Sequence, residues 1–173
     1  MKLDSLEPRM RFLHAADIHL GNQQYNLPER YDDFYRAFER VAQTALEYEV
    51  DVCLIAGDLF HKAELDPFTL LQAESCLKKM RDANIVVLSI SGNHDRAIYR
   101  NAESWLGYLH RNGYLTLLDP GSEPFGLTPE RTFVDINGVR FIGIPYLGAS
   151  TQAGLDTIAE QCCHVSWESI HFT

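Results

Sequence analysis

Three short apolar runs, separated by segments with helical periodicity, constrain the fold of this chain more than any other feature. The runs cover residues 11–16, 52–56 and 85–90. The second and third are continuously apolar, as strands buried on both faces of a parallel sheet are. Because crossover connections between such strands are almost always right-handed, we expect the three strands to be parallel. The order strand–helix–strand–helix–strand therefore predicts an α/β fold.

The segments between the runs have the spacing of amphipathic helices. Residues 17–30 are polar and predict a loop, and a helix is expected from Tyr31 onward. Its predicted apolar face consists of Phe34, Phe38, Val41, Ala42, Ala45 and Leu46. Asp66 and Pro67 supply an N-cap and a first helical residue for the second helix. The predicted apolar face of this helix consists of Phe68, Leu71, Leu77 and Met80.

The second half of the chain changes character. In chain order we expect a helix at 105–110, a strand at 115–118, a loop at 119–130, strands at 132–136 and 139–144, a helix at 151–161 and the start of a strand after 165. Asn137 and Gly138 separate the strands of the expected hairpin, because this dipeptide readily adopts the positive φ angles of a tight turn.

Composition places the chain among globular proteins. It has 173 residues with 46% hydrophobic residues, enough for one domain with a core. Residues 1–10 are predicted to be a disordered leader and residues 11–173 one domain. No apolar stretch is long enough to cross a bilayer. The four cysteines, Cys53, Cys76, Cys162 and Cys163, form no C-x-x-C pair. They predict free thiols and a reducing, cytoplasmic setting.

Polar clusters follow each of the first three predicted strands. The clusters are Asp17-x-His19, Gly57-Asp58 and Gly92-Asn93-His94-Asp95. Each alone also occurs in ordinary turns and helix caps. Because the carboxyl ends of parallel strands line one edge of a sheet, we expect the three clusters to converge. Their oxygen and nitrogen ligands suit manganese, iron or zinc. A carboxylate such as Asp58 can bridge two metals of the kind used on phosphate esters.

With the pattern D-x-H, G-D and G-N-H-D, the chain resembles the calcineurin-like metallophosphoesterases. The strings FLHAADIHLG, LIAGDLFH and ISGNHDR resemble more closely the SbcD-type nucleases of DNA repair, which are bacterial relatives of the eukaryotic double-strand-break repair nuclease. The resemblance runs from about residue 11 through residue 147. It implies an α/β/β/α four-layer metallophosphoesterase sandwich.

The resemblance also implies roles for the clustered residues. Asp17 and His19 are expected to ligate the first of two divalent metals, with manganese the expected ion. Asp58 is expected to bridge both metals, and Asn93 to ligate the second.

Three further residues acquire expected roles from the same resemblance. His94 is expected to stabilise the transition state and protonate the leaving oxygen, and His61 to place the strand to be cut. Asp95 is expected to orient His94 by a hydrogen bond. The implied reaction is hydrolysis of phosphodiesters in DNA. The implied partners are DNA, an SMC-like ATPase of the SbcC type and a second copy of the full-length protein; no membrane is expected.

The sequence departs from the family pattern in its later part. It has no G-H-x-H pair, and neither His164 nor His171 is assigned a ligand role. Asp17, His19 and Asp58 remain for the first metal, but only two ligands remain for the second. We therefore expect the chain to be the N-terminal portion of a nuclease domain, with a C-terminally incomplete sandwich.

Three functions are consistent with these patterns. The first is a manganese-dependent DNA nuclease, to which the net charge of −9 is a mild objection because DNA-coating proteins need a basic face. The second is a small-molecule phosphodiesterase, and the third is a fragment without turnover. Tyr25, Tyr31 and Tyr35 are interpreted as covering the core rather than stacking on bases. Arg96, Arg100 and Arg111 fit a solvated helix face and a DNA-backbone contact equally.

Overall fold

The computed structural model describes residues 10–95, 103–120 and 127–164. Its centre is a parallel sheet of four strands in the order β1-β2-β3-β4. The strands are β1 (Phe12–Ala15), β2 (Val52–Ala56), β3 (Val86–Ile90) and β4 (Thr116–Leu117). Both predicted parallel pairings are confirmed, because β2 pairs in parallel with β1 and with β3. The α/β class predicted from the sequence is therefore confirmed.

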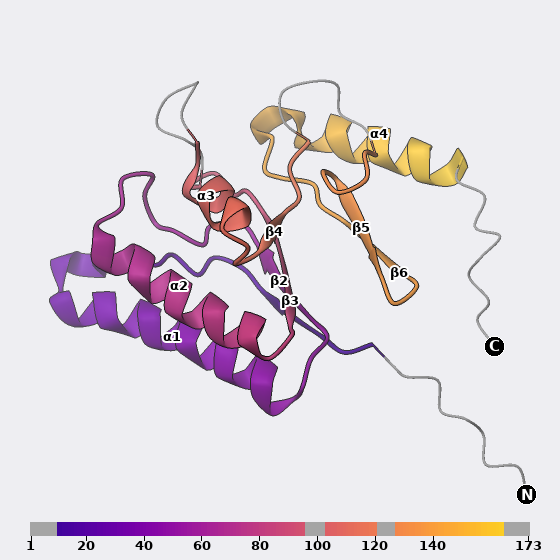
Figure 1. Cartoon of the computed structure of the whole chain (residues 1–173). Coiled ribbons are helices and arrows are strands. Elements are labelled where there is room, and N and C mark those ends of the chain that lie inside the picture. The colour runs from indigo at the N-terminus through magenta and orange to yellow at the C-terminus, as the bar shows by residue number, and fades with distance from the viewer. Residues whose placement is uncertain (1–9, 96–102, 121–126, 165–173) are drawn as a thin grey trace, which may run out of the picture.

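Helices cover one face of this sheet (Figure 1). They are α1 (Pro28–Glu47), α2 (Pro67–Asp82) and α3 (Trp105–Arg111), and a short 3-10 helix, η1 (Gln24–Asn26), precedes α1. The core between helices and sheet includes Phe38, Leu77 and Leu109. The prediction that α1 begins at Tyr31 is wrong by three residues. The helix begins at Pro28, whose fixed φ and missing N–H suit the first helical position.

The predicted apolar face of α2 is partly wrong. Leu77 and Met80 are fully buried, but the side chains of Phe68 and Leu71 are each 59% exposed. Thr69 is buried instead, and its hydroxyl bonds to the Asp66 carboxylate at 2.6 Å. The apolar spacing alone could not show that this hydroxyl would have a partner and so could be buried at low cost. On α1, Leu46 is likewise exposed, at 38%.

The other face of the parallel sheet carries the predicted hairpin. Strands β5 (Phe133–Ile136) and β6 (Val139–Ile142) are antiparallel, and the turn residues Asn137 and Gly138 have φ values of 49° and 79°. A second core joins the sheets, formed by Val52, Leu88 and Leu118 with Val134, Ile136 and Phe141 packed against them. A 3-10 helix, η2 (Gly148–Ser150), leads into α4 (Thr151–His164) on the hairpin side of the molecule. The layers run helix, sheet, hairpin, helix, as the predicted α/β/β/α arrangement requires.

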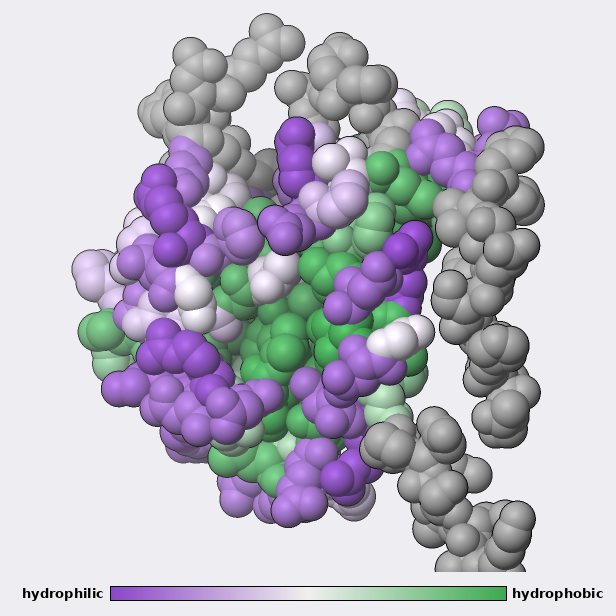
Figure 2. Space-filling view, turned by 45° about the vertical axis from the view of Figure 1, so that its right-hand side comes forward, coloured by the Kyte–Doolittle hydropathy of each residue, from purple (hydrophilic) through white to green (hydrophobic). Residues whose placement is uncertain are grey.

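Between the sheet and the hairpin lies an apolar cavity of about 210 Å³. Residues on β2 and β3, among them Leu54, Leu88 and Ile90, line it with Phe141 of β6. Figure 2 shows the face turned toward the hairpin side, where hydrophobic side chains form a continuous central area framed by hydrophilic ones. The cavity is lined mainly by apolar side chains and reaches Ala56 and Ile90, the last residues of β2 and β3. The polar clusters follow these strands, in the loops at the strand ends.

Several predictions concern residues outside the described part of the chain. They are the leader predicted for residues 1–10, of which only Met10 is described, the start of a strand after residue 165, and the roles of Arg96 and Arg100. Of the three tyrosines, Tyr35 packs against the core, whereas Tyr25 is 80% exposed. Among the described residues, no helix is long and apolar enough to span a membrane. Cys53 and Cys76 are free and buried.

Candidate metal centre

The three predicted clusters lie together at the carboxyl ends of β1, β2 and β3. The loop after β1 continues beside the loop after β2, because Asp17 N–H donates to the Gly57 carbonyl at 3.3 Å and His19 N–H to the Asp58 carbonyl at 2.9 Å. Further along, His61 N–H donates to the Leu20 carbonyl at 2.9 Å. These backbone bonds extend the register of the sheet into the site and fix the two loops relative to each other.

The backbone of the site is strained at its ligand residues. Asp17, His19 and Asp58 have φ values of 54°, 51° and 51°, in the left-handed region that residues with a Cβ seldom adopt. Each such residue costs about 1–2 kcal/mol relative to ordinary backbone. Strain of this kind collects at functional sites, where surrounding contacts hold it.

Two glycines allow the second and third loops to approach closely. A Cβ on Gly92 would lie 2.0 Å from Asp58 Oδ1 and 2.5 Å from its backbone nitrogen. A Cβ on Gly57 would lie 3.0 Å from Gly92 Cα, and Gly57 also has a φ of +87°. A side chain at Gly92 would therefore displace Asp58, and one at Gly57 would displace the Gly92 backbone.

Asp95 ties the second and third loops together. One oxygen of its buried carboxylate accepts from Asp58 N–H at 2.7 Å and Gly92 N–H at 2.9 Å, and the other from Phe60 N–H at 3.2 Å. Burial raises the pKa of Asp95, and the three backbone N–H groups act in the opposite direction. The expected hydrogen bond from Asp95 to the His94 ring is not the one formed, because both carboxylate oxygens accept from backbone N–H groups and His94 Nδ1 contacts the His61 carbonyl.

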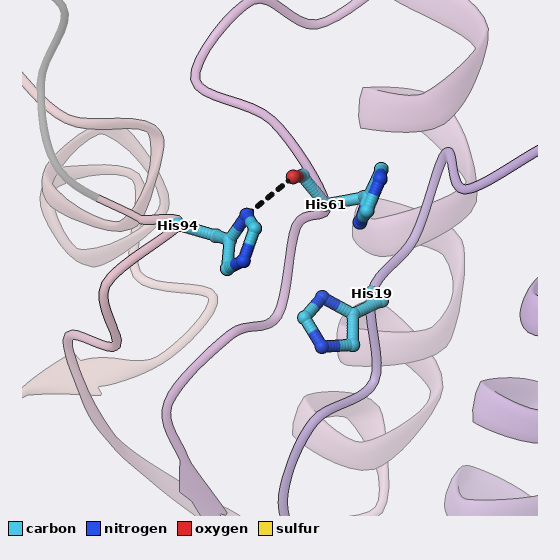
Figure 3. Close-up of side chains that lie close together, drawn as sticks. All are labelled: His19, His61 and His94. Carbon is cyan, nitrogen blue, oxygen red and sulfur yellow. Dashed lines mark hydrogen bonds between the residues drawn. The ribbon is translucent and has the colours of Figure 1, made fainter.

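The His94 ring is oriented by a backbone group. Its Nδ1 lies 2.7 Å from the His61 carbonyl oxygen (Figure 3). Because a carbonyl only accepts, we assign the proton of the neutral ring to Nδ1, which leaves Nε2 free. His94 N–H also donates to Asp58 Oδ1 at 2.9 Å. Sequence reasoning missed this role of the His61 carbonyl, and no residue type signals it, since every residue has one.

Asp17, His19 and Asp58 form a group of possible metal ligands within 4.8 Å of one another. His19 Nε2 lies 3.8 Å from Asp17 Oδ1 and 4.0 Å from Asp58 Oδ2. Asp58 is buried, whereas the Asp17 side chain is 76% exposed, so the site opens to solvent on one side. Asn93 lies in the same third loop, exposed between Gly92 and His94.

Among the residues that the structure describes, two buried nitrogen atoms in this region have no hydrogen-bond partner: His19 Nδ1 and His61 Nδ1. Buried polar atoms are nearly always satisfied, so these unpartnered imidazole nitrogens suggest a missing ligand. Burial lowers the pKa of His61, and the neighbouring His19 and His94 rings lower it further. A neutral imidazole is the form that binds metals. The residues present therefore fit a divalent cation.

The predicted site residues are thus brought to one edge of the sheet, including His61 and His94 from different loops. Arg111 is not part of this group; it forms an ion pair with Glu103 on the surface. Trp105, at the start of α3, packs against the core, and its Nε1 donates to the Ala63 carbonyl at 2.8 Å.

Comparisons with known proteins give relatives along most of the chain. DNA double-strand break repair protein Mre11 from Archaeoglobus fulgidus is 46% identical over 87 residues, 50% of this chain. The proteins of the same name from Haloferax volcanii and Aeropyrum pernix are each 37% identical, over 84% and 79% of this chain. The chain spans 20%, 30% and 32% of the lengths of these three relatives.

The family comparison covers the described fold and its site. Residues 10–160 match the calcineurin-like phosphoesterases, so the match includes all three strand-end clusters and the hairpin. Both this match and the ligand groups at the strand ends imply that the domain binds divalent metal. The chain belongs to the calcineurin-like phosphoesterase family.

Proposed function

We propose that this chain is part of a metal-dependent nuclease that hydrolyses phosphodiester bonds of DNA during double-strand-break repair. The observation that carries the proposal is the convergence of Asp17, His19 and Asp58 with His94 at one sheet edge. The names of the relatives, which describe repair of DNA double-strand breaks, support DNA as the substrate. A small-molecule phosphodiesterase of the same family is the alternative.

Asp17, His19 and Asp58 would hold the first divalent ion. Asp58 and Asn93 would contribute to a second ion, and we propose manganese for both. Bound cations would supply positive charge to the phosphate and lower the pKa of the attacking water. Asp58 is suited to a shared position because it is buried and because His94 N–H and Asp95 hold it on both sides.

His94 is the proposed general acid. With Nδ1 held by the His61 carbonyl, Nε2 is the nitrogen available to a substrate. In the charged ring Nε2 also carries a proton, and this proton can pass to the leaving oxygen. The His61 ring lies 5.4 Å from the His94 ring, centroid to centroid, and is proposed to place the DNA strand beside it.

The proposed partners are DNA, an SMC-like ATPase and a second copy of the complete protein, and the proposed location is the cytoplasm. The net charge of −9 is compatible with a nuclease, because loaded cations reverse the charge of the site.

The test is a substrate panel on the protein as the cell makes it, with manganese and without. Linear duplex DNA, bis(p-nitrophenyl) phosphate and a cyclic nucleotide are compared for the wild type, His94→Asn and the control His14→Asn. His14 is exposed on β1 and lines the apolar cavity. We expect manganese-dependent DNA cleavage that His94→Asn lowers by about 10²–10⁴-fold and His14→Asn leaves unchanged. Cleavage of small phosphodiesters with no cleavage of DNA would favour the alternative.

A further inference from the structure

Three histidines from three different loop positions surround one space in the site (Figure 3). The His19 ring centroid lies 5.4 Å from that of His61 and 5.1 Å from that of His94, and the last two lie 5.4 Å apart. One nitrogen from each ring lies within 4.8 Å of the others. This set shares only His19 with the carboxylate group described above.

The two groups use opposite edges of the His19 ring. Nε2 faces the Asp17 and Asp58 carboxylates at 3.8 and 4.0 Å. Nδ1, on the other side of the ring, is buried and has no partner in the described part of the chain. Among the described residues, His61 Nδ1 is also buried and unpartnered, and His94 turns its Nε2 toward the same space because its Nδ1 binds the His61 carbonyl (Figure 3). Nitrogens of three imidazole rings, two of them unpartnered among the described residues, therefore face a common space.

We propose that His19, His61 and His94 form a second kind of metal site, one that takes Zn²⁺. Three imidazoles and a water molecule make a common tetrahedral zinc site, with Zn–N distances of about 2.0–2.1 Å. In such a site the nitrogens lie about 3.3 Å apart, so they must approach by about 1.5 Å at most from their separations here. Small rotations of the rings supply this movement.

The ligand chemistry separates this site from the one that includes the carboxylates. Imidazole suits zinc and copper, whereas carboxylate oxygens suit manganese and magnesium. The backbones of the three histidines are already tied in place by bonds of 2.9 Å: His19 to the Asp58 carbonyl, His61 to the Leu20 carbonyl and His94 to the Asp58 carboxylate. Little ordering is required when the ion binds.

Zinc in this site has a regulatory consequence, which rests on the proposed function. It would engage both His19, a ligand of the first catalytic ion, and His94, the general acid. Zinc would then inhibit the manganese-dependent reaction. The binding claim itself does not depend on what the enzyme cleaves.

The experiment measures binding, so that its failure leaves the proposed function untouched. Zn²⁺ affinity is measured on the 173-residue chain by competition with a chromophoric chelator, and Mn²⁺ affinity by electron paramagnetic resonance. The variants are His61→Ala, which removes a ligand of the histidine site only, and Asp17→Asn, which removes a ligand of the carboxylate group only. His61→Gln repeats the first variant with a larger polar side chain, in case alanine disturbs folding.

Loss of a residue that only supports a metal ligand typically costs about 10–100-fold in metal affinity, and loss of a ligand itself should cost at least as much. We therefore expect His61→Ala and His61→Gln to weaken zinc binding by at least about tenfold and to leave manganese affinity unchanged. Asp17→Asn should weaken manganese binding and leave zinc affinity unchanged. Co²⁺ bound to the wild type should give the strong visible absorption of a tetrahedral complex, and this band should vanish in both His61 variants. Zinc affinity that is insensitive to His61, or that falls as much with Asp17→Asn, would overturn the proposal.

Discussion

Replacing Gly92 by alanine tests how the site is assembled. The new Cβ would lie 2.0 Å from Asp58 Oδ1, 2.5 Å from Asp58 N and 2.7 Å from Asp58 Cγ. Normal contacts to carbon begin near 3.4 Å, so the Asp58 carboxylate oxygen must move by about 1.4 Å. The Asp58 backbone cannot yield freely, since its N–H is bound to Asp95 and its carbonyl to His19.

These contacts determine how much stability and how much metal affinity the variant should lose. Forcing one methyl group into a packed position costs about 1–3 kcal/mol of stability. The movement also displaces the Asp58 carboxylate, which is the proposed shared metal ligand. Loss of an outer-shell contact already lowers metal affinity about 10–100-fold, so Gly92→Ala should lower Mn²⁺ affinity by at least that factor.

The assay combines urea unfolding with Mn²⁺ titration on the same samples. Gly138→Ala is the matched control, because its φ of +79° also strains alanine but nothing lies within 4 Å of the added Cβ. We expect the control to lose stability, about 1 kcal/mol, and to keep its manganese affinity. Wild-type manganese affinity in Gly92→Ala would refute the claim that close approach of the two loops positions Asp58.

Three further predictions concern other parts of the molecule. His94→Gln should leave Mn²⁺ affinity unchanged while phosphodiester turnover falls, because the ring is a proton donor and not a ligand of the first ion; a parallel loss of both would contradict its role. Asp66→Ala should cost about 1 kcal/mol in urea unfolding at neutral pH, since the carboxylate caps α2 through bonds to Phe68 N–H and Thr69 N–H at 2.9 and 3.0 Å. The Thr69 hydroxyl bond lowers the pKa of Asp66 below 3.8, so this stabilisation is present above pH 3.8 and should disappear as pH falls through the folded-state pKa. Burial raises the pKa of Cys53 to about 12 and of Cys76 to about 11, so neither thiol should react with iodoacetamide at pH 8 until urea unfolds the chain, as peptide mass spectrometry would show.

The sequence predicted the parts of the fold that depend on local chemistry. Continuous apolar runs located β2 and β3, and Asn137–Gly138 located the hairpin turn. The convergence of three clusters at one edge followed from parallel pairing. These predictions succeed because strand direction fixes which loops meet.

Features that depend on distant partners could not be predicted in this way. The exposure of Phe68 depends on what packs against α2, and the burial of Thr69 depends on Tyr31, whose hydroxyl lies 2.7 Å from the Thr69 hydroxyl. Asp95 was expected to orient His94 by a hydrogen bond, but in the folded chain its carboxylate accepts from backbone N–H groups of two loops. No spacing in the sequence distinguishes these alternatives.

The central claim is that the ends of the parallel strands build a divalent metal site around Asp58. The direct test compares thermal unfolding of the wild type and Asp58→Asn with and without Mn²⁺. Without metal, Asp58→Asn should be at least as stable as the wild type, because it removes a buried carboxylate beside that of Asp95 and keeps an oxygen for His94 N–H. At a Mn²⁺ concentration of about 100 times Kd, the wild type should gain about 2.7 kcal/mol and the variant almost nothing. Equal stabilisation of both proteins by Mn²⁺ would contradict the account.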